Sequence, residues 1–319
     1  MSNNPAELLT AERAGTILGT TLDSIRLGRM QTHMNLSLIP VFTDPVDRPA
    51  YDPLAEAIKG DSLTISEVSE SGSVPSLSVT NQGDRNVLII DGEELMGAKQ
   101  NRALNATVFI AANSRVDIPV SCTERGRWSY RSRNFHDSDV VLMHDIRKAK
   151  MASVSKSLSM KHGYASAQGE VWEEINTLHD KLHTHSPTSA MKDAYTSRQR
   201  DLDEYTGAFT LEEGQTGVLV FLNGKISALE MVSCARSFHY LHHKIVQSHA
   251  ISAIANPQTN AVFPSEDSAE GFIERIRFSE STSHPSPGLG HDIRLNSEVF
   301  QGSALCVGDV LVHTLVFGK

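Results

Sequence analysis

The sequence predicts an α+β fold with antiparallel-rich sheets, several helices and a helical insertion. Apolar segments flank Asn223-Gly224, a dipeptide typical of the tight turn between two antiparallel strands. Residues 168–182 instead place apolar side chains at helical spacing. Strands and helices follow each other in mixed order, unlike the regular alternation of a doubly wound sheet. We therefore expect a single domain over residues 1–319, with a helical insertion or subdomain at 138–209.

Composition indicates a globular protein that neither enters a membrane nor binds nucleic acid. Of the 319 residues, 39% are hydrophobic and 21% are charged, and no stretch approaches the roughly 20 apolar residues of a membrane helix. The 38 acidic residues outnumber the 29 basic ones, and a net charge of −9 disfavours general binding to phosphate backbones. The N-terminal residues lack the basic start and apolar centre of a secretory signal, so a cytoplasmic location is expected.

The first part of the chain predicts one helix and then short strands. Apolar residues between Pro5 and Gly28 recur at mostly helical spacing but are interrupted by glycines, which favours a broken amphipathic helix. Residues 34–44 predict a strand with Pro40 at an edge or end. Further strands are expected at 63–68, 74–81 and 87–90. Residues 103–112 and 116–122 flank Asn113-Ser114, and we expect these two segments to form an antiparallel hairpin.

The second part begins with the helical insertion, which Ser186-Pro187 divides. The hairpin around Asn223-Gly224 follows, and then helices over 233–255 and 265–278, the latter with Ser265 and Ser268 both able to cap it. A closing hairpin over 304–317 turns at Gly308-Asp309. This order again indicates an α+β protein.

The densest group of polar side chains follows the apolar segment 87–90. This polar run comprises Asp91, Glu93, Glu94, Lys99, Gln100, Asn101 and Arg102. A sheet fixes the end of a strand while the following loop leaves side chains accessible, so acids there can bind a metal or act as general acid and base. Asp91, Glu93 and Glu94 are therefore candidate catalytic residues. The same pattern is also compatible with an exposed turn or with a buried structural network.

A second polar group follows the predicted strand 116–122. The expected hairpin brings Glu124 and Arg127 toward Asn101 or Asn105. Arginine matches phosphate oxygens, while amides and carboxylates match ribose hydroxyls. We add Glu124 to the candidate catalytic acids, and the candidate ligand-binding residues are Lys99, Gln100, Asn101, Arg102, Asn105 and Arg127. Trp128 and Tyr130 can stack on a base or lie at the core or rim of the fold.

A short glycine-rich segment, Gly288-Leu289-Gly290, precedes His291 and Arg294. It lacks the third glycine of a dinucleotide-binding loop and precedes no clear helix, which favours a mobile loop. If this loop folds over the polar run, His291 and Arg294 supply an acid and an anion clamp, and both are candidate ligand-binding residues.

No metal ligand or cofactor is assigned. Two histidine pairs, His179 with His183 and His239 with His243, have the spacing of one helix face, but neither carries the glutamate of an HExxH motif. We interpret these histidines as surface or core residues. The three cysteines lie far apart with no CxxC pair, which favours reduced and mostly buried thiols.

The polar run and the segments that follow it resemble a bacterial family of unassigned function. The family is named for genomic association with ADP-ribosylglycohydrolase and rhodanese-phosphatase genes. The resemblance covers most of the chain and is carried by residues 91–102, 104–107, 118–122, 124–128, 168–172, 223–225, 288–290 and 312–313. It implies a connection with ADP-ribose or NAD metabolism and supplies no catalytic residues.

The expected function is therefore that of a small-molecule-binding protein or enzyme acting on a nucleotide or ADP-ribose-related ligand through residues 91–102. Two alternatives stay open. One is a noncatalytic interaction or scaffold protein, in which the same charges stabilise a hairpin. The other is a metal-dependent hydrolase that uses Asp91, Glu93 or Glu94. A homo-oligomer is compatible with each.

Overall fold

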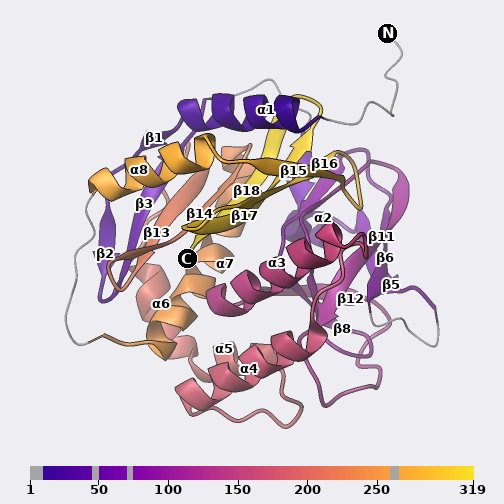
Figure 1. Ribbon diagram of the computed structural model, residues 1–319. Coiled ribbons are helices and arrows are strands. Elements are labelled where there is room, and N and C mark those ends of the chain that lie inside the picture. Colours follow the sequence, from indigo (N-terminus) through magenta and orange to yellow (C-terminus); the bar gives the residue numbers. More distant parts are fainter. Residues whose placement is uncertain (1–9, 45–49, 70–74, 259–265) are drawn as a thin grey trace.

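The computed structural model describes residues 10–44, 50–69, 75–258 and 266–319, and it confirms the α+β class. In this part of the chain, eight helices surround three mostly antiparallel sheets of nine, six and three strands (Figure 1). None of the described helices is long and apolar enough to cross a membrane.

The nine-stranded sheet has apolar side chains on both faces because helices cover both. In β13, Val218 and Val220 contact one core, and the alternating residues Leu219 and Phe221 contact another. Helices α1 (Ala11–Asp23) and α8 (Glu266–Arg277) cover the second face, while α7 (Ala235–Ala255) packs on the first (Figure 1). The strands run in the order β1-β3-β13-β14-β18-β17-β16-β15, with β2 also paired to β3. Their bounds are β1 Arg26–Leu27, β2 Gln31–His33, β3 Leu36–Phe42, β13 Gly217–Leu222, β14 Lys225–Val232, β15 Ser281–Pro285, β16 His291–Asn296, β17 Phe300–Val307 and β18 Val310–Gly318.

Two predicted hairpins of this sheet are confirmed. Strands β13 and β14 pair around Asn223 and Gly224, whose φ angles of 53° and 75° suit a tight hairpin turn. Strands β17 and β18 pair around Gly308-Asp309. Pro40 lies inside β3 rather than at its end, but its backbone faces the gap between β1 and β2, where Gly28 N donates to Pro40 O at 2.8 Å. The missing N–H therefore costs no ladder hydrogen bond.

The six-stranded sheet, with the order β12-β8-β9-β11-β6-β5, curls until its end strands β5 and β12 approach each other. Its concave face encloses a separate apolar core that includes Ile65, Leu95, Leu104, Val120 and Phe135. The strands are β5 Leu63–Glu67, β6 Ser76–Asn81, β8 Glu93–Gly97, β9 Arg102–Leu104, β11 Ser114–Cys122 and β12 Phe135–Val141. The small sheet, with the order β10-β7-β4, comprises β4 Tyr51–Pro53, β7 Asn86–Ile89 and β10 Val108–Ile110, and α2 (Leu54–Lys59) packs beside it.

The predicted hairpin around Asn113-Ser114 forms only in part: residues 103–104 pair antiparallel with 120–121 as expected, but 108–110 pair with another strand. Residues 103–112 form two strands in different sheets, because β9 pairs with β11 whereas β10 pairs with β7. The chain leaves β11 after Asn105, whose side chain accepts from the Ser121 hydroxyl at 2.6 Å and donates to Tyr164 O, while the Thr107 hydroxyl bonds to His313 of β18. Sequence spacing alone did not show this break.

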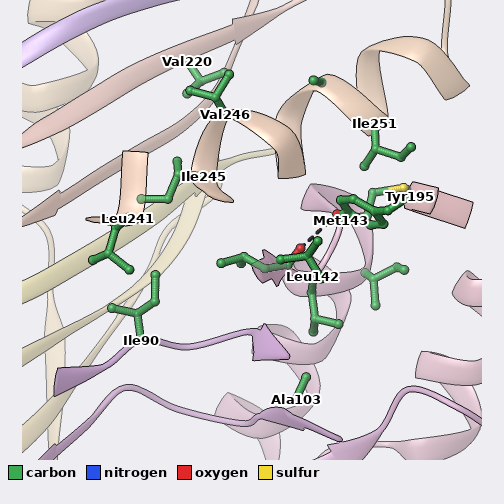
Figure 2. Packing of buried hydrophobic residues seen from close by; sticks show 14 of the residues in the cluster. Ile90, Ala103, Leu142, Met143, Tyr195, Val220, Leu241, Ile245, Val246 and Ile251 are labelled. Atoms are coloured by element: carbon green, nitrogen blue, oxygen red, sulfur yellow. Dashed lines mark hydrogen bonds between the residues drawn. The ribbon is translucent and has the colours of Figure 1, made fainter. Parts of the chain in front are cut away.

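The helical segment comprises α3 (His144–Ser159), α4 (Gln168–Leu182), α5 (Met191–Ser197) and α6 (Gln199–Gly207). Helix α4 has the predicted bounds, but residues 138–141 belong to β12. These helices share one core with α7 and the large sheet, in which Met143 and Tyr195 lie near Ile251 (Figure 2). The Tyr195 hydroxyl donates to Val141 O at 2.9 Å. Helix α1 runs unbroken through both of its glycines; the start of its predicted range, at Pro5, and the Ser265 cap lie outside the described residues.

A closed loop of buried polar contacts joins the large sheet to α3 and to the β7–β8 turn. Arg147 of α3 donates to both carboxylate oxygens of Glu230 in β14, at 2.8 and 2.6 Å, and its Nε lies 3.5 Å from Asp91 Oδ1. His313 Nε2 lies 3.0 Å from Glu230, and its Nδ1 lies 2.8 Å from the Thr107 hydroxyl. Asp91 N donates to that hydroxyl at 2.9 Å.

Two further close contacts belong to this network, one at Asp91 and one at Gly92. Lys150 donates to Asp91 at 2.9 Å, so the carboxylate faces two cations. Gly92 has a φ of 82°, and a Cβ there would lie 2.8 Å from Arg147 Nε. Only glycine leaves room for the guanidinium at this turn.

We predict that Glu230→Gln destabilises the protein by about 3 to 5 kcal/mol at pH 7, because it leaves the buried Arg147 without its anion. Burial acts to raise the pKa of Glu230, but the opposite effect of Arg147 and His313 is larger, and the resulting pKa is about 2. The stabilisation from this carboxylate is therefore complete above pH 4.5 and is lost as the pH falls toward 2. Urea unfolding at several pH values measures the difference, which should shrink at low pH.

The exposed Glu213→Gln variant is the control and should change the free energy of unfolding by less than about 0.5 kcal/mol. A cost below about 1 kcal/mol for Glu230→Gln would show that the pair does not hold the sheets together.

Candidate functional site

All the polar side chains of the run 91–102 are buried. The exposed fractions are 0% for Asp91, Glu93, Glu94 and Arg102, 2% for Asn101, 5% for Gln100 and 8% for Lys99. The exposed-turn interpretation is therefore wrong, because helices and the segment 123–134 pack against these residues. Each group has a different environment.

The pleat of the curled sheet divides the run between two faces. Leu95 pairs with Arg102, and Glu94 pairs with Ala103. Since side chains alternate along a strand, Arg102 lies on the concave face with Leu95, and Glu94 lies on the convex face. Glu94 and Arg102 therefore do not converge on one ligand.

Asp91 and Glu93 are both held by lysines from distant helices. Asp91 belongs to the network around Arg147 and Lys150 described above. Glu93 accepts from Lys244 of α7 at 3.0 Å and from Ile90 N at 2.9 Å, and Lys244 also lies 2.5 Å from Asp137. Burial raises the pKa of Glu93 despite the opposing charge of Lys244. Both acids have structural partners.

Glu94 is the acid of this run that is held by a neutral partner. It accepts from the Thr123 hydroxyl at 2.6 Å. Burial raises the pKa of Glu94 to about 7, outweighing the hydroxyls of Thr123 and Ser138 and the charge of Lys192. Burial also lowers the pKa of Lys192, which donates to Ser138 O at 2.7 Å. Glu94 can thus exchange a proton near neutral pH.

Asn101, Glu124 and Arg127 come together as predicted. Glu124 accepts from Arg127 Nε at 2.9 Å, from Asn101 N at 3.2 Å and from the Thr188 hydroxyl at 2.8 Å. Arg127 also donates to Gly97 O, Ala98 O and Ser129 O. Burial raises the pKa of Glu124, but the bonds from Arg127 and Thr188 outweigh it and the net pKa is lowered. This cluster closes the 97–101 loop and leaves Arg127 little capacity for a ligand.

Arg102 and Lys99 form the remaining group, beneath two aromatic rings. Arg102 Nη1 donates to Gln100 Oε1 at 2.6 Å and to Cys122 Sγ at 2.7 Å, while its Nε and Nη2 have no hydrogen-bond partner. The Arg102 guanidinium lies 5.6 Å from the ring centre of Trp128. Lys99 Nζ lies 5.4 Å from Trp128 and 5.2 Å from Tyr130. These rings are 49% and 54% exposed.

A surface hollow of about 1110 Å³ opens beside Tyr130, between β5 and the loop that precedes β12. Polar side chains dominate its wall, and two of them, Arg131 and Arg133, are exposed cations. The lining residues are Thr64, Ser66, Glu67, Ser69, Tyr130, Arg131, Ser132, Arg133 and Asn134. We call this group the β5 hollow.

The other candidate residues lie elsewhere. Asn105 donates to Tyr164 O at 2.9 Å, and the Arg294 guanidinium lies 5.8 Å from the Tyr164 ring while it pairs with Asp292. Gly288-Leu289-Gly290 forms the turn between β15 and β16, and Leu289 N donates to Phe109 O at 2.7 Å. The segment is thus held against β10 instead of folding as a mobile loop over the polar run. His291 begins β16 in this hairpin.

In the described ranges no three histidine, cysteine, aspartate or glutamate side chains are grouped so that they could hold a metal ion. His179 bonds to the Thr184 hydroxyl and to Ala190 O, and His243 lies 2.8 Å from Gln247 Nε2. These histidines have protein partners.

Four residues of these clusters had not been singled out from the sequence, namely Glu67, Lys150, Glu230 and Lys244. One signal was available: Glu230 and His313 interrupt apolar strands, and a charge on a buried face needs a partner. Nothing in the sequence identified the partners, because Arg147 and Lys244 lie on helices far along the chain.

Comparison with known proteins places the chain in a family. The sequence model of the ARPP-1 domain, described as ARG and Rhodanese-Phosphatase-superfamily-associated Protein, matches residues 24–317. The chain belongs to the ARPP-1 family. No curated protein and no solved structure matches this ARPP-1 member. The family match spans strands of all three sheets and all the clusters above.

We predict that Glu94→Gln stabilises this ARPP-1 member increasingly as the pH rises. The folded-state pKa near 7 exceeds the ordinary value of 4.5, so ionisation of Glu94 above pH 4.5 favours the unfolded chain. Between pH 5 and pH 8 the stability difference between variant and wild type should grow by about 2.5 kcal/mol. Urea unfolding at both pH values measures it.

Glu173→Gln, an exposed change on α4, is the matched control and should show no such trend. A difference that stays constant between pH 5 and pH 8 would contradict the raised pKa of Glu94.

Proposed function

We propose that this ARPP-1 member binds a small anionic ligand with a flat ring, a nucleotide or an ADP-ribose-related compound, at the Arg102 end of the curled sheet. The observation that supports this most directly is the unpaired guanidinium of Arg102. The proposal concerns binding, because the buried acids Asp91 and Glu93 have lysine partners and Glu94 faces away from Arg102.

Arg102 is a buried cation without an anion. Its side chain is 0% exposed, and no carboxylate of the described residues lies within 4.0 Å of it. Arginine cannot lose its proton in a protein, and an unpaired buried charge costs on the order of several kcal/mol. The free Nε and Nη2 groups match two oxygens of a phosphate in fork geometry. A ligand phosphate supplies the missing charge.

Trp128 and Tyr130 are the residues that we expect to contact the flat ring of the ligand. Trp128 and Tyr130 each lie near a lysine or arginine and remain about half exposed, and exposed aromatic surface suits stacking with a base. Trp128 also covers Arg102, which means that its ring turns aside when a phosphate enters. The ADP-ribosylglycohydrolase connection expected from the sequence makes ADP-ribose the first ligand to test.

We predict that wild type binds ADP-ribose and AMP, with adenosine much weaker, and that Arg102→Met weakens AMP binding roughly 10-fold to 100-fold. Calorimetric titration at fixed salt measures the affinities. The same variant should unfold at an equal or higher temperature than wild type, because it removes an unpaired buried charge. The unfolding temperature thus shows whether Arg102→Met has lost ligand binding while it keeps its fold.

Arg277→Met is the matched control, since Arg277 also lies over an aromatic ring, 5.0 Å from Phe278, but on α8. It should bind like wild type. The proposal is contradicted if wild type binds none of the phosphorylated ligands at millimolar concentration, or if Arg102→Met binds AMP as tightly as wild type.

A further inference from the structure

The wall of the β5 hollow contains an acid that has no partner. Glu67 is the last residue of β5, and both of its carboxylate oxygens are buried without a hydrogen bond in the described chain. An unpaired carboxylate offers only acceptors, so it selects groups that donate hydrogen bonds. Two free oxygens on one carboxylate can accept from two neighbouring hydroxyl groups at once.

Glu67 also lies on the side of the sheet that contains Arg102. Burial is the main cause that raises the pKa of the Cys122 thiol; the charge of Arg102 lowers it and that of Glu67 raises it. The strand register shows the same: Glu67 is in line with Leu77 and Ile118, on the face of β11 that also contains Cys122, and Arg102 donates to the Cys122 sulfur. A ligand whose phosphate pairs with Arg102 therefore binds on the face of the curled sheet that also contains Glu67.

We propose that Glu67 is the specificity residue of this site and that it selects ligands with a vicinal diol, a ribose with free 2′ and 3′ hydroxyls. This inference rests on the proposed function. Carboxylates bind the ribose of nucleotides in this way in dinucleotide-binding folds, where an acid accepts from the sugar hydroxyl. Neighbouring hydroxyl and amide side chains, Ser66, Ser132 and Asn134, line the same hollow and suit a sugar. Arg131 and Arg133, exposed on its rim, suit a second phosphate.

The test compares AMP with 2′-deoxy-AMP by calorimetric titration. Wild type should bind AMP at least about tenfold more tightly, because the deoxy compound leaves a buried acceptor unpaired. In Glu67→Ala the ratio of the two affinities should fall to within about twofold. Glu67→Gln, which keeps the shape and one acceptor, should give an intermediate ratio and guards against a folding defect in the alanine variant.

Glu298→Gln is the control, since Glu298 lines a different hollow between α8 and β17, and it should leave the ratio at the wild-type value. If wild type binds AMP and 2′-deoxy-AMP equally, or if Glu67→Ala keeps the preference, the diol inference is overturned while ligand binding stands. If wild type binds neither compound nor ADP-ribose, the proposed function and the diol inference both fail.

Discussion

The bidentate contact between Arg147 and Glu230 is the interaction on which the rest of the structure depends. It links helix α3 to the middle of the nine-stranded sheet, and the same guanidinium reaches Asp91 at the turn between β7 and β8. Both side chains are fully buried, so neither can exchange its partner for water. Gly92 has no side chain, which allows the turn to approach Arg147. The contact thus ties the turn before β8 to helix α3 and to the large sheet.

That constraint explains why the polar run serves two purposes. Its acids, Asp91 and Glu93, neutralise lysines that enter from α3 and α7. After β8 the chain turns, and the cations Lys99 and Arg102 lie near the rings of Trp128 and Tyr130 instead. There, Arg102 has hydrogen bonds to an amide and a thiol but no opposite charge among the described residues. Asp91 and Glu93 therefore stabilise the fold, whereas Arg102 keeps two N–H groups without a hydrogen-bond partner.

Local patterns predicted much of the fold. Helix α4 and the Asn223-Gly224 hairpin follow from the spacing of nearby residues, and both are confirmed. The hairpin at Asn113-Ser114 forms only where β9 pairs with β11, because residues 108–110 pair with β7 instead and the preceding Thr107 bonds to the distant His313. The candidate site shows the same limit. The grouping of Glu124 and Arg127 with Asn101 depends on neighbouring strands and could be predicted, whereas the burial of Asp91 and Glu93 depends on Lys150 and Lys244 and could not.

The central claim is that the unpaired guanidinium of Arg102 receives a ligand phosphate beneath Trp128. A crystal structure of the protein with ADP-ribose tests it most directly. We expect a phosphate oxygen within hydrogen-bonding distance of Arg102 Nε or Nη2, the Trp128 ring displaced from its position over the guanidinium, and Asp91 and Glu93 unchanged with their lysines. A ligand bound elsewhere, with Arg102 still covered by Trp128, would contradict the account.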